Sequence, residues 1–523
     1  IFRGKEGRVM LARVNSYALN GLDGYGVTVE VDIHAGLPAF DVVGLPDVAI
    51  KESRERVRSA IKNSGYDFTP RKITVNLAPA YTKKEGPIFD LAIALGILCS
   101  TEQAGVDDRK KPLPFVNEYA FLGELSLSGA VSRINGVMPM LIAAREHGVK
   151  KIVIPKANVN EAKYICGIDV YAVETLRDAI GLINGEVIAP IEKSAIAANV
   201  APSASEDLKY VKGQYSAKRA LEIAASGGHN ILMIGSPGGG KTMLAKCLPS
   251  ILPDMTEREI LETTKIHSVA GILDSERGIV TARPFRSPHH TTSRAALTGG
   301  GSSARPGEIS FAHNGVLFLD ELPEYPRNVL EILRQPLEDG VVSVARAARS
   351  VEYPANFMLV ASMNPCPCGY YRSQSHECSC SQAQIQKYMS RISGPLLDRI
   401  DLHIEVDEVH YDDLTAHGEA ESSATVKQRV NAARAIQNVR FEGTCVHCNA
   451  DMTSEMIKKY CVLDGDGERI LQNAFDKLGL SARAYTRILK VARTIADLGG
   501  ADKISAKHVA EAVMYRTLDK AVR

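Results

Sequence analysis

A glycine-rich segment constrains the fold of this chain more than any other feature of its sequence. The segment runs Gly235-Ser-Pro-Gly-Gly-Gly-Lys241-Thr242. The apolar run Ile231–Ile234 before it predicts a buried parallel strand, and Met243–Leu248 after it predicts a helix. In this order, the glycines let backbone N–H groups wrap phosphates at the start of the helix. The residues expected to contact ATP here are Gly235, Ser236, Pro237, Gly238, Gly239, Gly240, Lys241, Thr242 and Met243.

Individual side chains near this loop have expected roles of their own. Lys241 can reach the β- and γ-phosphates of ATP, and the Thr242 hydroxyl can ligate Mg²⁺. A second apolar run, Val316–Leu319, ends in the acids Asp320 and Glu321. We expect Asp320 to hold Mg²⁺ through water and Glu321 to orient the attacking water. A glycine loop or a charged strand end can each be purely structural, but their order along one domain favours a nucleotide site.

The length of 523 residues predicts several domains. Residues 10–184 alternate β-type runs with helical patterns, which predicts a compact α/β domain. Residues 185–206, rich in Ala, Ser and Pro, predict a linker. Residues 207–407 predict the nucleotide-binding α/β domain, with a Cys-rich insert at 365–382. Residues 408–523 show no strand signal and predict a helical lid, with a strongly amphipathic helix at Ala482–Leu498.

The overall composition excludes some functions and restricts others. The formal net charge is +1, so any contact with nucleic acid must come from local basic patches. No apolar run is long enough to span a bilayer, and the short basic start of the sequence is not a signal peptide. We therefore expect a cytoplasmic protein without a membrane partner.

Clustered cysteines indicate a metal site. Cys366, Cys368, Cys378 and Cys380 form two Cys-x-Cys pairs, and four thiolates suit tetrahedral Zn²⁺. The alternative is a set of reduced thiols in a polar loop. Cys445 and Cys448 lack a partner pair, and we do not expect a second site there.

The order of four motifs resembles one branch of the AAA+ ATPases, the branch that holds the magnesium-chelatase ATPase subunits and the MCM helicases. After the phosphate loop and Leu319-Asp-Glu321 come Ala361-Ser-Met-Asn364-Pro365 and Gly394-Pro-Leu-Leu-Asp-Arg399-Ile-Asp-Leu402. The resemblance implies that Asn364 is the sensor following its strand. It also implies that Val211 and Gln214 lie on the adenine.

The same resemblance implies roles for arginines. Arg399 would act on the ATP of a neighbouring subunit, and Arg483 would be the sensor of the lid, with Arg487 as a rival. Without the family pattern, Arg399 could equally form a salt bridge with a neighbouring aspartate, and Arg483 could be a solvated helix position.

A closer resemblance covers nearly the whole chain and is to the ComM/YifB family of magnesium-chelatase-like proteins. It rests on Val42-Val-Gly-Leu-Pro-Asp47, Glu52-Ser-Arg-Glu-Arg-Val-Arg58, Ile73-Thr-Val-Asn-Leu-Ala-Pro79, Arg286-Ser-Pro-His-His-Thr-Thr292 and Met363-Asn-Pro-Cys-Pro-Cys-Gly369. The resemblance implies a homo-oligomeric ring, a hexamer, that uses ATP to drive DNA branch migration in homologous recombination during natural transformation. The alternatives are a magnesium-chelatase-type or protein-remodelling ATPase, and a nucleotide-binding structural protein.

The first domain resembles the Lon proteolytic, S5-like α/β fold. Within that pattern, Lys84-Glu-Gly-Pro-Ile88 puts Ile88 at the nucleophile, and Gly136-Val-Met-Pro-Met140 puts Met140 at the catalytic lysine. Neither side chain has a proton to transfer, so peptidase activity is not expected. The domain would instead be a scaffold or a DNA platform. DNA contact and a solvated helix face explain its basic positions equally well: Lys51, Arg54, Arg56 and Arg58.

Two basic segments are candidates for contact with single-stranded or branched DNA without regard to its sequence. The first lies between Thr281 and Arg305, has no acidic residue, and includes Arg286 and Arg294. The second includes Arg346 and Arg349, where the helicase relatives carry a β-hairpin directed into the ring channel. The alternatives are solvated loops or pairing with a neighbouring subunit's acids.

Overall fold

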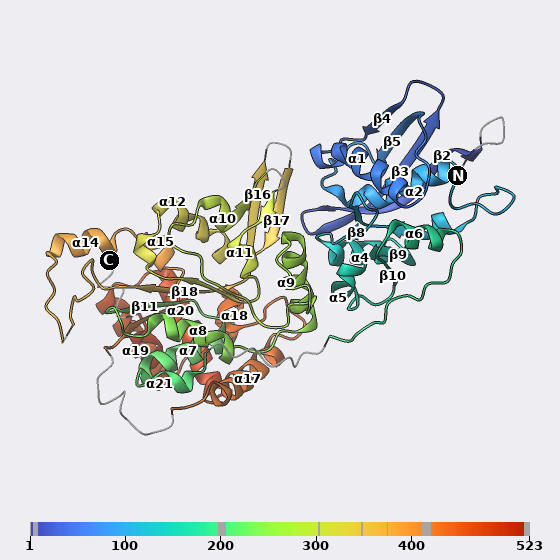
Figure 1. The fold of residues 1–523 in the computed structure, drawn as a ribbon. Coiled ribbons are helices and arrows are strands. Elements are labelled where there is room, and N and C mark those ends of the chain that lie inside the picture. Colours follow the sequence, from blue (N-terminus) through green and yellow to red (C-terminus); the bar gives the residue numbers. More distant parts are fainter. Residues whose placement is uncertain are drawn as a thin grey trace.

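The computed structural model describes residues 2–3, 9–196, 206–301, 304–346, 349–373, 375–408 and 420–516. Two β-sheets organise these residues, each with its own set of helices, and they lie beside each other (Figure 1). The predicted α/β fold class is confirmed. Within the described ranges, no helix has both the length and the apolarity that crossing a membrane requires.

The N-terminal sheet has the strand order β10-β9-β6-β2-β3-β5-β4, with β1 beside β2. Its strands are β1 (Phe2–Arg3), β2 (Val9–Asn20), β3 (Asp23–His34), β4 (Ala39–Val43), β5 (Lys72–Ala78), β6 (Tyr119–Phe121), β9 (Lys151–Pro155) and β10 (Asp169–Val173). In β3, the buried Val27, Val29 and Val31 alternate with more exposed residues. This period of two gives the sheet its apolar face.

Helices pack on this sheet, and a small hairpin of β7 (Glu124–Leu125) and β8 (Val131–Ser132) lies beside it. The helices are α1 (Val48–Asn63), α2 (Asp90–Ser100), α3 (Phe115–Glu118), α4 (Val137–Glu146), α5 (Val159–Ala162) and α6 (Leu176–Ile183). α2 is buried along its whole length because it packs against β2 and β3 as well as α1. That placement explains its unbroken apolar run.

The second sheet is fully parallel, with the order β12-β15-β18-β11-β19. Its strands are β11 (Ile231–Gly235), β12 (Phe285–Arg286), β15 (Val316–Leu319), β18 (Met358–Met363) and β19 (Leu402–Val406). Every residue of β15 and β18 is buried, as expected for strands covered on both faces. A separate hairpin of β16 (Val341–Arg346) and β17 (Arg349–Pro354) lies beyond the sheet, next to the N-terminal part (Figure 1).

Helices surround the parallel sheet. The longer ones are α7 (Tyr215–Gly227), α8 (Lys241–Ile251), α9 (Glu257–Ala270) and α14 (Gln382–Met389). The shorter ones are α10 (Arg294–Thr298), α11 (Glu308–Phe311), α12 (Arg327–Leu330), α13 (Pro336–Asp339) and α15 (Gly394–Leu397). A short ribbon of β13 (Gly299–Gly300) and β14 (Arg305–Pro306) adjoins α10 and α11.

The last part of the chain is helical over its described range, 420–516. Its helices are α17 (Ser423–Arg440), α18 (Ser454–Tyr460), α19 (Gly465–Leu478), α20 (Ala482–Leu498) and α21 (Ala506–Met514). α20 begins and ends at the residues expected from the amphipathic pattern. α17 packs against α7 and α8, and α20 packs against α7, so this part shares one hydrophobic core with the parallel sheet.

The two sheets are connected by direct contacts as well as by the chain. α4 packs against α9, the Arg133 guanidinium donates to the Leu273 carbonyl (3.0 Å), and Asn160 donates to the Ser275 carbonyl (3.0 Å). Residues 197–205 of the expected linker lie outside the described residues. Before them, the amides of Ile191 and Ser194 bond to Val170 and Lys163, so the linker begins along the N-terminal domain.

Candidate functional site

The carboxyl ends of β11, β15 and β18 meet at one edge of the parallel sheet. The glycine loop follows β11, Asp320 follows β15, and Asn364 follows β18. Parallel pairing brings these three chain segments together although they are distant in sequence. The edge is therefore the place where the residues predicted for ATP and Mg²⁺ converge.

The Lys241 amine lies within the loop that carries it. Its Nζ donates to the carbonyls of Gly235 (2.6 Å) and Ser236 (2.9 Å) and to Oδ1 of Asn364 (3.2 Å). Burial lowers the pKa of Lys241, while Asp320 and Glu321 act in the opposite direction. A buried ammonium bonded only to neutral oxygens is well suited to receive an anionic phosphate.

Backbone geometry explains a glycine of the loop. Gly240 has φ of 84° and immediately precedes the first turn of α8. A side chain would be strained in this left-handed conformation. The N-terminus of α8, where backbone N–H groups are unpaired, therefore opens toward the loop.

The two acids after β15 are held differently. One oxygen of Asp320 accepts from the Thr242 hydroxyl (2.9 Å), and the other accepts from the Ser362 hydroxyl. Glu321 has φ of 52°, its side chain is 55% exposed, and its Oε2 lies 3.4 Å from Nδ1 of His290. Thr242 and Asp320 thus offer adjacent oxygens, the ligand type that Mg²⁺ prefers. The carboxylate of Glu321 lies apart from this pair, beside His290.

Ser362 and His290 are site neighbours that sequence reasoning missed. The register pairs Leu319 with Ala361, so the residues that follow, Asp320 and Ser362, lie side by side. Knowledge of the strand pairing would have identified Ser362. No local spacing signal connects His290 with Glu321, because the loop that carries the histidine packs against this edge only in the folded protein.

Further residues expected to contact ATP differ in exposure. Val211 is buried in the core, whereas Met243 is 44% exposed. Gln214, with φ of 56°, donates its side-chain amide to the carbonyls of Asp407 (2.6 Å) and Gly239 (3.3 Å). Gln214 therefore ties the segment before α7 to the phosphate loop.

Arg399 and Arg483 lie away from this edge. β11 and β19 are parallel, with Ile231 opposite Leu402, and Arg399 comes just before β19 begins. It is therefore at the amino edge of the sheet, whereas the phosphate loop is at the carboxyl edge. The Arg399 side chain is only 4% exposed and pairs with Glu338; Arg483, 60% exposed, lies 3.6 Å from the same carboxylate.

Arg487, the alternative to Arg483 as the sensor of the lid, has a charged partner within the same chain. It forms an ion pair with Asp401, which is buried and also accepts from the backbone amide of Asn230 (3.1 Å). The arginine lowers the pKa of Asp401 against the opposing effect of burial. Arg487 is thus paired within its own subunit, and Arg483 is the more accessible of the two.

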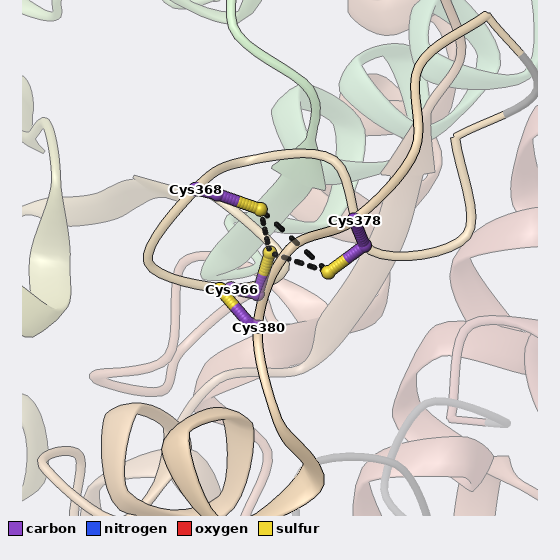
Figure 2. A group of neighbouring side chains, drawn as sticks. All are labelled: Cys366, Cys368, Cys378 and Cys380. Carbon is purple, nitrogen blue, oxygen red and sulfur yellow. Dashed lines mark hydrogen bonds between the residues drawn. The ribbon is translucent and has the colours of Figure 1, made fainter.

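The four cysteines predicted to bind metal converge, and Figure 2 shows their sulfur atoms directed toward one another. Cys366 Sγ lies 3.3 Å from that of Cys368 and 3.7 Å from that of Cys378, and the latter two are 3.6 Å apart. Tetrahedral Zn²⁺ with bonds of about 2.3 Å would set its sulfurs about 3.8 Å apart. The cluster, with all four sulfurs within 4.8 Å of one another, fits such an ion.

The cysteine insert contacts the phosphate loop. At Gly369, a side-chain β-carbon would come within 2.6 Å of the Pro237 ring, so the two backbones approach closely. Ser373 and Ser375 of the insert donate to Glu408, and these bonds lower the pKa of that carboxyl. The insert therefore packs on one wall of the candidate ATP site.

The arginines predicted for DNA have different surroundings. Arg286 donates two hydrogen bonds to Glu308 (2.7 and 2.8 Å) and lies over the Phe311 ring, so its charge is already paired within the chain. Arg294 is exposed at the start of α10. The backbones of Arg346 and Arg349 pair across the hairpin end, but their side chains lie outside what the structure describes.

In the N-terminal domain, Ile88 packs against the apolar cluster that contains Met140. Ile88 also lines a cavity of about 920 Å³ between the N-terminal domain and the β16–β17 hairpin, whose far wall includes Val351 and Tyr353 of β17. The basic positions of α1 vary: Arg54 is half-exposed and pairs with Glu55, Arg56 pairs with the buried Asp90, Arg58 lies over Phe68, and Lys51 is exposed.

Family models match three parts of the chain. The model for magnesium chelatase, subunit ChlI, matches residues 207–414. The model for subunit ChlI of Mg-chelatase matches residues 29–158, and that for the C-terminal part of the magnesium chelatase subunit ChlI matches residues 420–516.

Individual proteins match over almost the whole length. Competence protein ComM of Haemophilus influenzae is 43% identical over 514 residues, 97% of this chain and 98% of that protein. The protein YifB of Escherichia coli is 43% identical over 511 residues, 98% of each chain. Lon protease 2 of Bacillus subtilis is 32% identical over 131 residues, which are 25% of this chain and 22% of the protease.

Proposed function

Because the chain belongs to the ComM/YifB family of magnesium-chelatase-like AAA+ proteins, we propose that it is an ATP-hydrolysing ring motor acting on DNA. Its specific task would be branch migration in homologous recombination during natural transformation. The observation that carries the proposal is the convergence of Lys241, Thr242, Asp320, Glu321 and Asn364 at one sheet edge.

Each of these residues has a role that its contacts support. Lys241 exchanges its neutral carbonyl partners for the β- and γ-phosphates of ATP. Thr242 and Asp320 would hold Mg²⁺, which neutralises phosphate charge when bound. Glu321, exposed beside His290, orients the attacking water, and Asn364 stays within reach of Lys241 to hold the γ-phosphate.

We propose that Arg399 and Arg483 complete the ATP site of a neighbouring subunit. Both lie at the sheet edge opposite their own phosphate loop and share Glu338. A role in the neighbour's site requires an oligomer, for which we propose a closed ring of six subunits. An arginine supplied in this way is worth about 10³–10⁵ in rate.

Zn²⁺ is the metal that we propose for the cysteine cluster. Four thiolates within 4.8 Å of one another would hold the ion and fix the loop from Cys366 to Cys380. A structural metal there would brace the phosphate loop through Gly369 and, through α14 and α15, the segment that ends at Arg399. The intracellular compartment in which thiolates stay reduced, the cytoplasm, suits this assignment.

The proposal for DNA rests on the hairpin and on a relative. ComM of H. influenzae is named a competence protein, which supports a role in handling incoming DNA. In this chain we assign the contacts to Arg346 and Arg349 at the hairpin end and to the exposed Arg294. Arg286 is a weaker candidate because Glu308 neutralises it.

A magnesium-chelatase-type or protein-remodelling ATPase is the second candidate, favoured by the three ChlI family matches. The two functions differ in what stimulates hydrolysis. We expect single-stranded or forked DNA to raise the ATPase rate of the purified chain. A rate indifferent to every DNA structure would contradict the motor proposal and favour a protein partner.

Substitution of a hairpin arginine tests the proposed DNA contact separately. Arg346→Ala should keep basal hydrolysis but weaken DNA stimulation, and should reduce the salt slope of single-strand binding by about 0.7. Arg109→Ala, an exposed arginine of the N-terminal domain, is the matched control. Equal effects of the two substitutions on the salt slope would remove the hairpin from the DNA site.

A further inference from the structure

One carboxylate binds both arginines that we assign to the neighbouring subunit's ATP. Oε1 of Glu338 pairs with Arg399 and lies 3.6 Å from Arg483. Arg399 is buried, whereas Glu338 is 49% exposed. Arg399 lowers the pKa of Glu338, so this side chain carries its charge at neutral pH. Glu338 therefore neutralises arginines that the proposed reaction needs elsewhere.

The hydrogen bonds of Arg399 are incomplete in this arrangement. One terminal nitrogen donates to the Pro395 carbonyl (2.6 Å) and another pairs with Glu338, but its Nε has no partner among the described residues although it is buried. A buried donor without an acceptor is costly. A phosphate group, with more charge and more acceptor oxygens than one carboxylate, can satisfy such a guanidinium better.

Glu338 is also directly connected to the hairpin assigned to DNA. It lies in α13, which ends at Asp339; only Gly340 separates this helix from β16, which begins at Val341. The Gly340 carbonyl accepts from the Ala355 amide (2.7 Å) and so closes the base of the hairpin. A movement of the α13 backbone would therefore reach both hairpin strands at their base.

We propose that Glu338 is a latch between the subunit interface and the hairpin. Without nucleotide in the neighbouring subunit, Glu338 holds Arg399 and Arg483. When that site fills, both arginines exchange Glu338 for phosphate oxygens, and α13 with the β16–β17 hairpin is released to move. The inference rests on the proposed function and adds to it a residue that couples nucleotide binding to hairpin position.

The chain has no tryptophan, so all tryptophan fluorescence of a variant comes from the one residue that is introduced. Ser343 is exposed on β16 and suits this purpose. In Ser343→Trp protein, a non-hydrolysable ATP analogue should shift the tryptophan emission. Adding Glu338→Gln to this protein should move the emission measured without nucleotide toward the emission measured with the analogue. Because an ion pair to a half-exposed carboxylate is weak, we expect its loss to reduce the latched population roughly two- to fivefold.

Matched variants separate the latch from general damage. Glu331→Gln removes a nearby carboxylate that pairs with Arg334 (2.9 Å) and should leave the reporter unchanged. Glu338→Asp keeps the charge on a shorter side chain and should give an intermediate emission. This variant tests the latch even if Glu338→Gln lowers the stability of the fold. Affinity for the analogue should rise in Glu338→Gln by no more than the same two- to fivefold, because the analogue favours the released state, and should be unchanged in Glu331→Gln.

Two results would overturn the latch. Glu338→Gln protein could have the same nucleotide-free emission as the reporter protein and respond fully to the analogue, or Glu331→Gln could have an equal effect. Failure of the reporter protein itself to bind ATP would instead contradict the proposed function.

Discussion

Glu321 adopts a left-handed backbone conformation, with φ of 52°, that costs a non-glycine residue about 1–2 kcal/mol. The surrounding structure holds it there, with the carboxylate exposed beside His290. Glu321→Gln should preserve folding and ATP binding, because the amide has the same shape, but lower turnover about 10²–10⁴-fold, because it cannot accept a proton from water. Phosphate release measured beside equilibrium ATP binding tests both halves of this expectation.

Lys241→Ala should differ from Glu321→Gln in that it abolishes ATP binding and not only turnover. It removes the only side-chain ammonium bonded to the phosphate-loop carbonyls among the described residues, so binding itself should be lost. By comparison, if Glu321→Gln protein hydrolyses ATP at the wild-type rate, Glu321 does not have the catalytic role that we propose.

At the scale of elements, the cysteine insert and the phosphate loop form one unit, because Gly369 packs directly on Pro237. We expect about one zinc ion per chain from the four-thiolate ligand set. Cys378→Ser combined with Cys380→Ser should release the ion and also weaken ATP binding, since the insert no longer supports the loop. Elemental analysis and nucleotide titration of the same samples measure the two effects.

Cys166→Ser is the control for the insert, since Cys166 is exposed and lies in the N-terminal domain. It should change neither metal content nor ATP affinity. Metal-free protein from a preparation without chelators would contradict the zinc site, and release of zinc with unaltered ATP binding would contradict the bracing role alone.

At the scale of the whole molecule, a site divided between subunits predicts complementation. Arg399→Ala protein should bind ATP through its own loop yet hydrolyse it slowly, and Lys241→Ala protein should not bind it. Mixed together, the two should recover partial activity, because some interfaces join an intact loop to an intact arginine. Hydrolysis rates over a series of mixing ratios measure this recovery.

Each variant assayed alone provides the baseline for that experiment. A mixture no more active than the sum of its parts, in rings verified by electron microscopy, would place Arg399 in a structural role. Its burial against Glu338 and Pro395 would then be its whole function.

The domain division remains a proposal, although several elements match the expected patterns. The helix at Ala482–Leu498 and the strand at Val316–Leu319 have the predicted bounds, because each carries a strong periodic or unbroken apolar pattern. The docking of the first linker residues onto the N-terminal domain was not predicted, since backbone pairing such as that of Ile191 with Val170 leaves no local pattern.

The residues proposed to bind phosphate could be located from the sequence alone. The glycine loop, Asp320 and Asn364 each come directly after a buried strand, and parallel strands bring their carboxyl ends to one edge. The four cysteines were equally predictable, because ligand type and short spacing restrict where thiolates can lie.

Which arginines are already paired became clear from the folded structure. Arg286 is neutralised by Glu308, Arg487 by Asp401, and Arg399 shares Glu338 with Arg483. None of these pairs follows from local sequence, because each joins elements brought together by packing of the whole chain. A charged side chain can therefore act on a ligand only where that ligand displaces the partner that the fold has given it.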